Sequence, residues 1–146
     1  MAFWQYSFWA IPEKNIKKKY GNIPKEVGEE DFNSIAWFDG YSEWSFLETI
    51  DYLSSSSHWS NSVKFFGDLE SDCIAIDYED DKLCEIFMRI DLTKDYALMA
   101  KKMMGSVKIS GLLILDEELK IINDSLDEFI SRLEDICDER NKSFER

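Results

Sequence analysis

The sequence is poor in the residues that most enzymes use for catalysis or metal binding. It contains one histidine, His58, and three cysteines, Cys73, Cys84 and Cys137, none of which belongs to a C-x-x-C pair. The odd number and wide spacing of the cysteines argue against a disulfide framework and a zinc site, and they fit a reducing compartment. The chain also lacks the G-x-x-x-x-G-K-[ST] and G-x-G-x-x-G phosphate loops. We therefore expect a protein that is not an enzyme and has no metal or other cofactor.

Long hydrophobic runs are missing as well. No apolar segment approaches the roughly 20 residues that a membrane-spanning helix requires. The first residues, MAFWQYSFWAIPEKN, show neither the basic lead nor the small-residue cleavage site of a secretory signal. These absences predict a cytoplasmic protein whose mature chain begins here and which has no membrane partner.

Positive charge is scarce, with 17 Lys and Arg against 30 Asp and Glu and a formal net charge of −13. Residues 26–91 carry a net charge of −14, whereas residues 1–25 carry +4 and residues 92–146 carry −3. Because affinity for phosphate depends on clustered Lys and Arg, we expect no nucleic-acid partner, and we interpret the basic run at 14–20 as a solvated face. An acidic surface favours a cationic partner through long-range attraction; solubility alone is the simpler explanation.

Core-forming residues are abundant. The 146 residues, 45% of them hydrophobic, suffice for one sizeable core, so we predict a single globular domain spanning 1–146. Apolar alternation and short apolar runs predict strands, of which the last two form a hairpin with a three-residue turn. The predicted strands are 3–11, 34–40, 63–67, 73–78, 83–92 and the two arms of 112–122. Apolar residues at helical spacing predict helices at 45–53, 95–109 and 125–140. The Lys-rich piece between Pro12 and Pro24, which ends at Gly21, predicts a short helix at 14–20.

The ends of these helices carry recognisable signals. Ser45 and Ser125 are each followed three residues later by Glu, the pattern of a capping box. The helix after Asp95 ends at Gly105 or runs on to Ile109. Segments 28–34 and 54–62 are predicted as loops. The order of elements lacks the regular alternation of a parallel α/β fold, so we predict an α+β domain, a mostly antiparallel sheet with helices packed on one side.

The run CIAIDYEDDKLCEIF at 73–87 predicts a hairpin whose register can be tested by burial. A two-residue turn at 80–81 would mix apolar and charged side chains on both faces. A three-residue turn at 80–82 pairs Ile76 with Ile86 and Tyr78 with Cys84, which makes one face apolar throughout. Since a slip by one residue would move a whole buried set into water, we predict the second register.

The opposite face of this hairpin then places Asp77 directly across from Glu85. Opposed like charges cost about 0.2–1 kcal/mol, so stability alone does not select the pair. Three interpretations apply: a solvated edge, a protein-docking patch and a divalent-cation site, although the acids lack the glycine and spacing of an EF-hand loop. For the docking patch, the candidate residues are Asp68, Glu70, Asp72, Asp77, Glu79, Asp80, Asp81 and Glu85.

A second candidate region is the aromatic stretch around residues 37–44 and 58–59. Aromatic rings beside carboxylates are typical hot spots for a cationic partner, although they are also typical of the end of a core. The candidates here are Asp39, Glu43, Trp44 and Trp59. His58 is interpreted as an ordinary loop residue, and the methionines of 99–104 as core.

In size, acidity and absence of catalytic motifs, the whole chain resembles the immunity proteins of bacterial toxin systems. These are small acidic cytoplasmic α+β proteins, encoded beside a toxin, that bind its domain and block the active site or substrate surface. The resemblance implies neutralisation of a cognate basic toxin domain, with a nuclease as the implied kind because nucleases present basic surfaces. The alternatives are a non-enzymatic adaptor or structural module, and a small enzyme using His58 or a carboxylate-bound metal.

Overall fold

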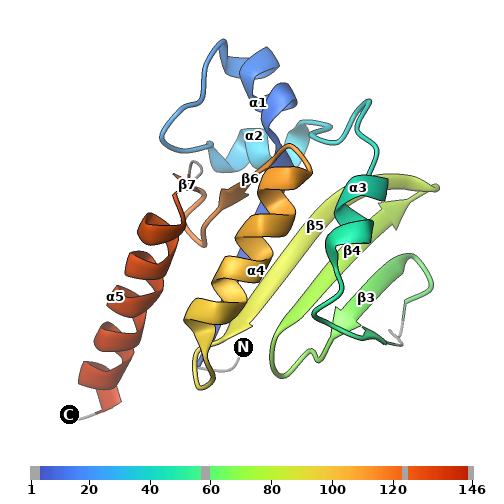
Figure 1. Ribbon diagram of the computed structural model, residues 1–146. Coiled ribbons are helices and arrows are strands. Elements are labelled where there is room, and N and C mark those ends of the chain that lie inside the picture. Colours follow the sequence, from blue (N-terminus) through green and yellow to red (C-terminus); the bar gives the residue numbers. More distant parts are fainter. Residues whose placement is uncertain (1–3, 57–59, 123–124, 145–146) are drawn as a thin grey trace.

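Antiparallel strands form one sheet in the order β2-β3-β4-β5-β1-β6-β7, in a computed structural model that describes residues 4–56, 60–122 and 125–144 (Figure 1). The strands are β1 (Gln5–Pro12), β2 (Ser55–Ser56), β3 (Val63–Gly67), β4 (Cys73–Glu79), β5 (Lys82–Asp91), β6 (Leu112–Leu115) and β7 (Ile121–Ile122). The helices are α1 (Glu13–Tyr20), α2 (Glu29–Ser34), α3 (Trp44–Thr49), α4 (Tyr96–Ile109) and α5 (Leu126–Phe144). The predicted α+β class is confirmed, as is the β3-β4-β5 meander.

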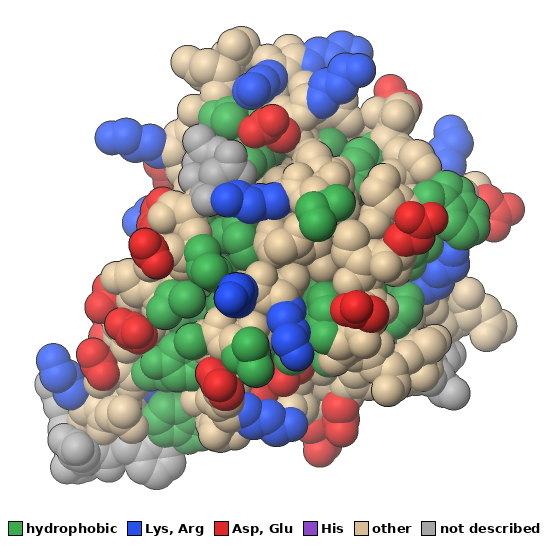
Figure 2. All heavy atoms as spheres, viewed as in Figure 1, with side chains coloured by type: hydrophobic (Ala, Val, Ile, Leu, Met, Phe, Trp, Pro, Cys, Tyr) green, Lys and Arg blue, Asp and Glu red, His purple; other side chains and the backbone are tan. Residues whose placement is uncertain are grey.

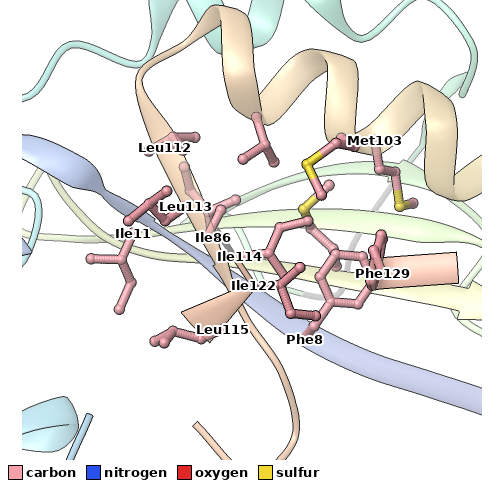
Figure 3. Close-up of a cluster of buried hydrophobic side chains, with 14 of the residues drawn as sticks. Phe8, Ile11, Ile86, Met103, Leu112, Leu113, Ile114, Leu115, Ile122 and Phe129 are labelled. Atoms are coloured by element: carbon pink, nitrogen blue, oxygen red, sulfur yellow. The ribbon is translucent and has the colours of Figure 1, made fainter. Parts of the chain in front are cut away.

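One face of the sheet forms the core. Alternate residues of β1, β4 and β5 point to this face, and eight of them are at most 2% exposed: Tyr6, Phe8, Ala10, Ile74, Ile76, Ile86, Met88 and Ile90. Phe8 of β1 pairs with Met88 of β5, which pairs in turn with Ile74 of β4. Helices α4 and α5 cover this face, where Phe129 meets Phe8 edge-on at 5.0 Å between ring centroids and Met103 reaches in from α4 (Figure 3).

The opposite face is covered only in part. At one end the turn between β3 and β4 lies against it, because the Leu69 carbonyl accepts hydrogen bonds from Gln5 Nε2 at 3.3 Å and Arg89 Nη1 at 2.8 Å. Gln5 and Ser7, which the alternation places away from the core, are therefore only 4% and 5% exposed. Towards the other end, residues such as Phe87 are half-buried.

The segment between α1 and α3 differs from the sequence-based prediction. Residues 28–34, expected as a loop, contain α2, whose first turn carries three acids that suit the positive end of a helix. Residues 34–40, expected as a strand, form turns instead, with Trp37 N–H donating to the Ile35 carbonyl and Asp39 N–H to the Ala36 carbonyl. Trp37 and Phe38 are buried from these turns, so apolar side chains pointing into the core produced the pattern of a strand.

Helix ends follow the predicted signals in part. Ser125 Oγ accepts from Glu128 N–H at 3.0 Å, as the capping box predicts. Asp95 caps α4, which continues through Gly105 to Ile109. The capping box at Ser45 was wrong, because α3 already begins at Trp44 and has no side-chain cap. Within the predicted loop 54–62, β2 pairs with β3.

The hairpin of β6 and β7 has a longer turn than predicted. Ile114 pairs with Ile122, so residues 116–120 form the turn in place of three residues. Asp116, only 1% exposed, accepts hydrogen bonds from two backbone N–H groups of the turn, at 2.8 and 2.9 Å. Its carboxylate also lies 2.7 Å from Arg132 of α5. A buried, paired carboxylate thus shapes a turn that contains no glycine.

The β4–β5 hairpin combines the two registers weighed from the sequence. Ile76 pairs with Ile86 and Asp77 with Glu85, as predicted. The turn, however, has two residues, so Tyr78 pairs with Leu83 and the predicted pairing with Cys84 is wrong. Asp80 and Asp81 adopt φ values of 51° and 64°, which give a tight turn matching the strand twist. A β-bulge at Cys84 absorbs the extra residue and keeps the apolar face in register.

We predict that Asp81→Gly stabilises the protein by about 0.5–1 kcal/mol, because glycine adopts a positive φ without steric cost. Urea unfolding measures the change. Asp81→Ala is the control, since it removes the same charge but keeps a Cβ and lacks the tolerance of a positive φ that asparagine shares with glycine. An equal gain from both variants would attribute the effect to charge and contradict the conformational explanation.

Candidate partner-binding surface

Strands β1 and β5 stop pairing with each other before β5 reaches its hairpin turn. Their pairing ends at Trp9 and Phe87; β1 continues beside β6, whereas β5 continues beside β4 towards the hairpin turn. Residues 32–43, from the end of α2 to the start of α3, lie against this opening. A cavity of about 900 Å³ is found here, and we call it the acidic cleft.

The walls of the acidic cleft combine carboxylates with aromatic rings. Its aromatic residues are Trp9, Phe32, Trp37, Phe38 and Tyr41. Its charged residues are Asp39, Glu43, Asp77, Glu79, Asp80, Asp81, Glu85 and one cation, Lys82. Two regions that the sequence suggested separately, the acidic hairpin and the aromatic segment, therefore line one hollow.

Charge is mixed on the face of the molecule seen from the side of α4. Figure 2 shows basic side chains there interspersed with acidic ones. The basic groups of α1 and α4 include Lys17, Lys18, Lys19 and Lys108. Seven carboxylates against one lysine in the acidic cleft are therefore a local concentration of negative charge, beyond what the mixed face carries.

Three of the predicted acids lie elsewhere. Asp68, Glu70 and Asp72 belong to the turn before β4, at the opposite end of that strand from the acidic cleft. Asp68 Oδ1 accepts from Glu70 N–H at 2.9 Å, and Asp72 Oδ1 accepts from Asp91 N–H at 2.7 Å. Burial raises the pKa of Asp72, and this hydrogen bond works against the shift. The structure gives Asp68 and Asp72 a part in shaping the turn.

Of the predicted aromatic candidates, Trp44 follows the cleft residue Glu43 and is 66% exposed. Trp59 and His58 lie outside the described residues. Sequence reasoning missed Trp9 and Phe32, whose rings meet edge-on at 5.4 Å in the wall of the acidic cleft. The alternation within residues 3–11 already places Trp9 on the face away from the core, which is a usable signal.

Glu85 is the acid most affected by its surroundings. Its Oε1 accepts a hydrogen bond from Trp9 Nε1 at 2.9 Å, across the opening between β1 and β5. Burial raises the pKa of Glu85; the bond from Trp9 lowers it, and the negative charge of the opposed Asp77 raises it further. Protonation of Glu85 would therefore relieve both the cost of burying its charge and its repulsion from Asp77.

This arrangement suits cationic side chains. Carboxylates accept hydrogen bonds from ammonium or guanidinium groups, while the neighbouring rings offer flat apolar and cation–π contacts. Among the residues that the structure describes, no group of three or more His, Cys, Asp or Glu side chains is arranged to hold a metal ion. In the part of the chain that the structure describes, no helix is both long and apolar enough to cross a membrane.

Comparison with known proteins gave no relatives. A scan against protein-family models found no match, and searches of curated proteins and of solved structures also found none. Function is therefore argued from the acidic cleft itself.

We predict that Glu85→Gln raises the free energy of unfolding at pH 7 by about 0.2–1 kcal/mol, because it removes the repulsion from Asp77 while its amide oxygen still accepts from Trp9. Because the pKa of this carboxyl group is raised in the folded state, the group lowers the free energy of unfolding as pH rises through that pKa. The gain should accordingly disappear near about pH 3, where the glutamate is protonated in both states.

Urea unfolding at both pH values measures this effect. Glu79→Gln is the matched control, because Glu79 is exposed and pairs across the turn with Lys82. A gain of the same size at both pH values, or an equal gain in the control, would contradict the explanation.

Proposed function

We propose that this protein is an immunity-type protein that binds a cognate basic bacterial toxin domain and neutralises it by covering its active site or substrate surface. The observation that carries the proposal is the convergence of carboxylates and aromatic rings in the acidic cleft. The proposal includes a non-enzymatic role in the cytoplasm.

A hollow of this composition favours a protein partner with projecting cationic side chains. Interface hot spots combine aromatic contact area with charged groups that become desolvated together. Trp9 and Phe32 supply the rings, and Glu85 supplies a carboxylate already withdrawn from water. A lysine or arginine entering here would relieve the repulsion between Glu85 and Asp77, so binding removes an existing cost.

Stability alone does not account for these acids. Asp77 and Glu85 oppose each other, and Asp80 and Asp81 occupy backbone conformations that glycine or asparagine adopts more easily. Residues that lower stability at a site are commonly retained for function. Their shared position around one hollow supports a binding role more than a role in solubility.

A nuclease is the proposed kind of toxin. A nuclease groups Lys and Arg on its surface to hold phosphates, and the acidic cleft presents carboxylates to the same groups. The net charge of −13 would also accelerate encounter with such a basic surface.

The test is calorimetric titration against the product of the adjacent upstream gene. The cleft variant Asp39→Lys/Glu79→Lys reverses one exposed acid on each side of the acidic cleft. We expect its dissociation constant to rise at least about 100-fold, since each new lysine repels the basic partner. The control Glu134→Lys/Asp138→Lys makes the same change in net charge on exposed positions of α5 and should change affinity less than about threefold.

Equal losses in both variants would show that net charge, not the acidic cleft, controls binding. If the product of the adjacent upstream gene is not a toxin and does not bind, the proposed function is wrong. That result would favour a non-enzymatic adaptor or structural module. Binding that is insensitive to salt would also argue against a basic partner.

A further inference from the structure

The structure holds one of its own lysines against two aromatic rings whose chain neighbours, Glu43, Asp77 and Glu79, line the acidic cleft. Lys64 Nζ lies 5.6 Å from the ring centroid of Trp44 and 5.2 Å from that of Tyr78. Both distances are within the range of a cation–π interaction. The sequence gives no sign of this contact, because the three residues come from α3, β3 and β4.

The fold brings these side chains together through strand register and helix packing. Lys64 pairs with Ile76, so Tyr78, two residues further along β4, is its diagonal neighbour on the helix-covered face. Helix α3 lies over this part of the sheet and buries Phe46, which places Trp44 at the start of the helix beside the lysine (Figure 1).

A carboxylate lies beside the Tyr78 hydroxyl, on the side of the acidic cleft. Glu43 precedes Trp44 and lines the acidic cleft. Burial, together with the neighbouring Glu43, raises the pKa of Tyr78 well above its usual range. The Tyr78 hydroxyl is buried and makes no hydrogen bond of ordinary geometry, yet it lies close enough to Glu43 for the two to interact.

We propose that Trp44 and Tyr78 form a cation-binding subsite beside Glu43, that Lys64 occupies it in the free protein, and that a lysine or arginine side chain of the partner replaces Lys64 on the Trp44 ring. The identity of that partner rests on the proposed function, whereas the class of ligand rests on the bound lysine itself.

Replacement is physically favourable for three reasons. Lys64 is exposed and sits on a flexible stem, so its ammonium group can return to water at little cost. Trp44 is 66% exposed, so an incoming side chain has access to the ring. Arginine stacks on an aromatic face better than lysine does, so a guanidinium group competes well for this position.

Competition by Lys64 has an unusual consequence. A side chain that only stabilises the fold would weaken binding when removed, whereas a resident competitor strengthens binding when removed. Loss of the Lys64 charge should therefore increase affinity for a cationic ligand about two- to fivefold, the worth of one exposed cation–π contact.

The experiment titrates the full-length protein with a hexa-arginine peptide, acetylated and amidated at its ends, and follows the indole N–H resonance of Trp44 by NMR. Trp44→Phe identifies that resonance. Lys64→Met keeps the apolar stem and removes the charge. Lys64→Gln is a second variant that also removes the charge. We expect both variants to bind the peptide about two to five times more tightly than the unmodified protein, with larger shifts at Trp44.

Lys101→Met is the matched control, because it removes one exposed lysine from α4 and should leave affinity within about 1.5-fold. The subsite is overturned if both Lys64 variants bind no more tightly than this control, or if Trp44 does not respond while residues of the acidic cleft do. That second result would leave the proposed function intact. Conversely, tighter peptide binding by the Lys64 variants would support the subsite even if the neighbouring gene product failed to bind.

Discussion

The buried face shared by β1, β4 and β5 is the constraint on which the rest of the structure depends. Because Ile76 and Ile86 must point into the core, Asp77 and Glu85 must point the other way and oppose each other. The bulge at Cys84 reconciles this register with a two-residue turn. The acidic end of the hairpin is thus a consequence of how the core is built.

The acidic cleft follows from the central position of β1. This strand pairs with β5 only as far as Trp9 and then with β6. The first residues of β5, 82–86, therefore have no β1 residue beside them. Trp9 spans the opening with its bond to Glu85, and the aromatic segment before α3 forms the far wall. Core packing therefore fixes the positions of the carboxylates, and their charges remain available for a partner.

Local patterns in the sequence predicted what local physics determines. Alternation was enough for the α+β class and for the pairing of Ile76 with Ile86, since burial alone selects them. It failed at Trp37, which is buried from a turn packed beside Tyr20 of α1 and Phe32 of α2. It also grouped Asp72 with the hairpin acids, because proximity along the chain does not show that β4 separates them. Asp39 and Glu85 line the same cleft although 46 residues separate them, a relation that no window of sequence contains.

The central claim is that the acidic cleft is the surface that a basic toxin domain covers. Hydrogen–deuterium exchange of the protein, alone and saturated with the product of the adjacent upstream gene, tests it most directly. The account predicts slower exchange on binding in residues 35–43 and 77–86, and unchanged exchange in α5. Protection confined to α5, or to the turn at 68–72, would contradict it.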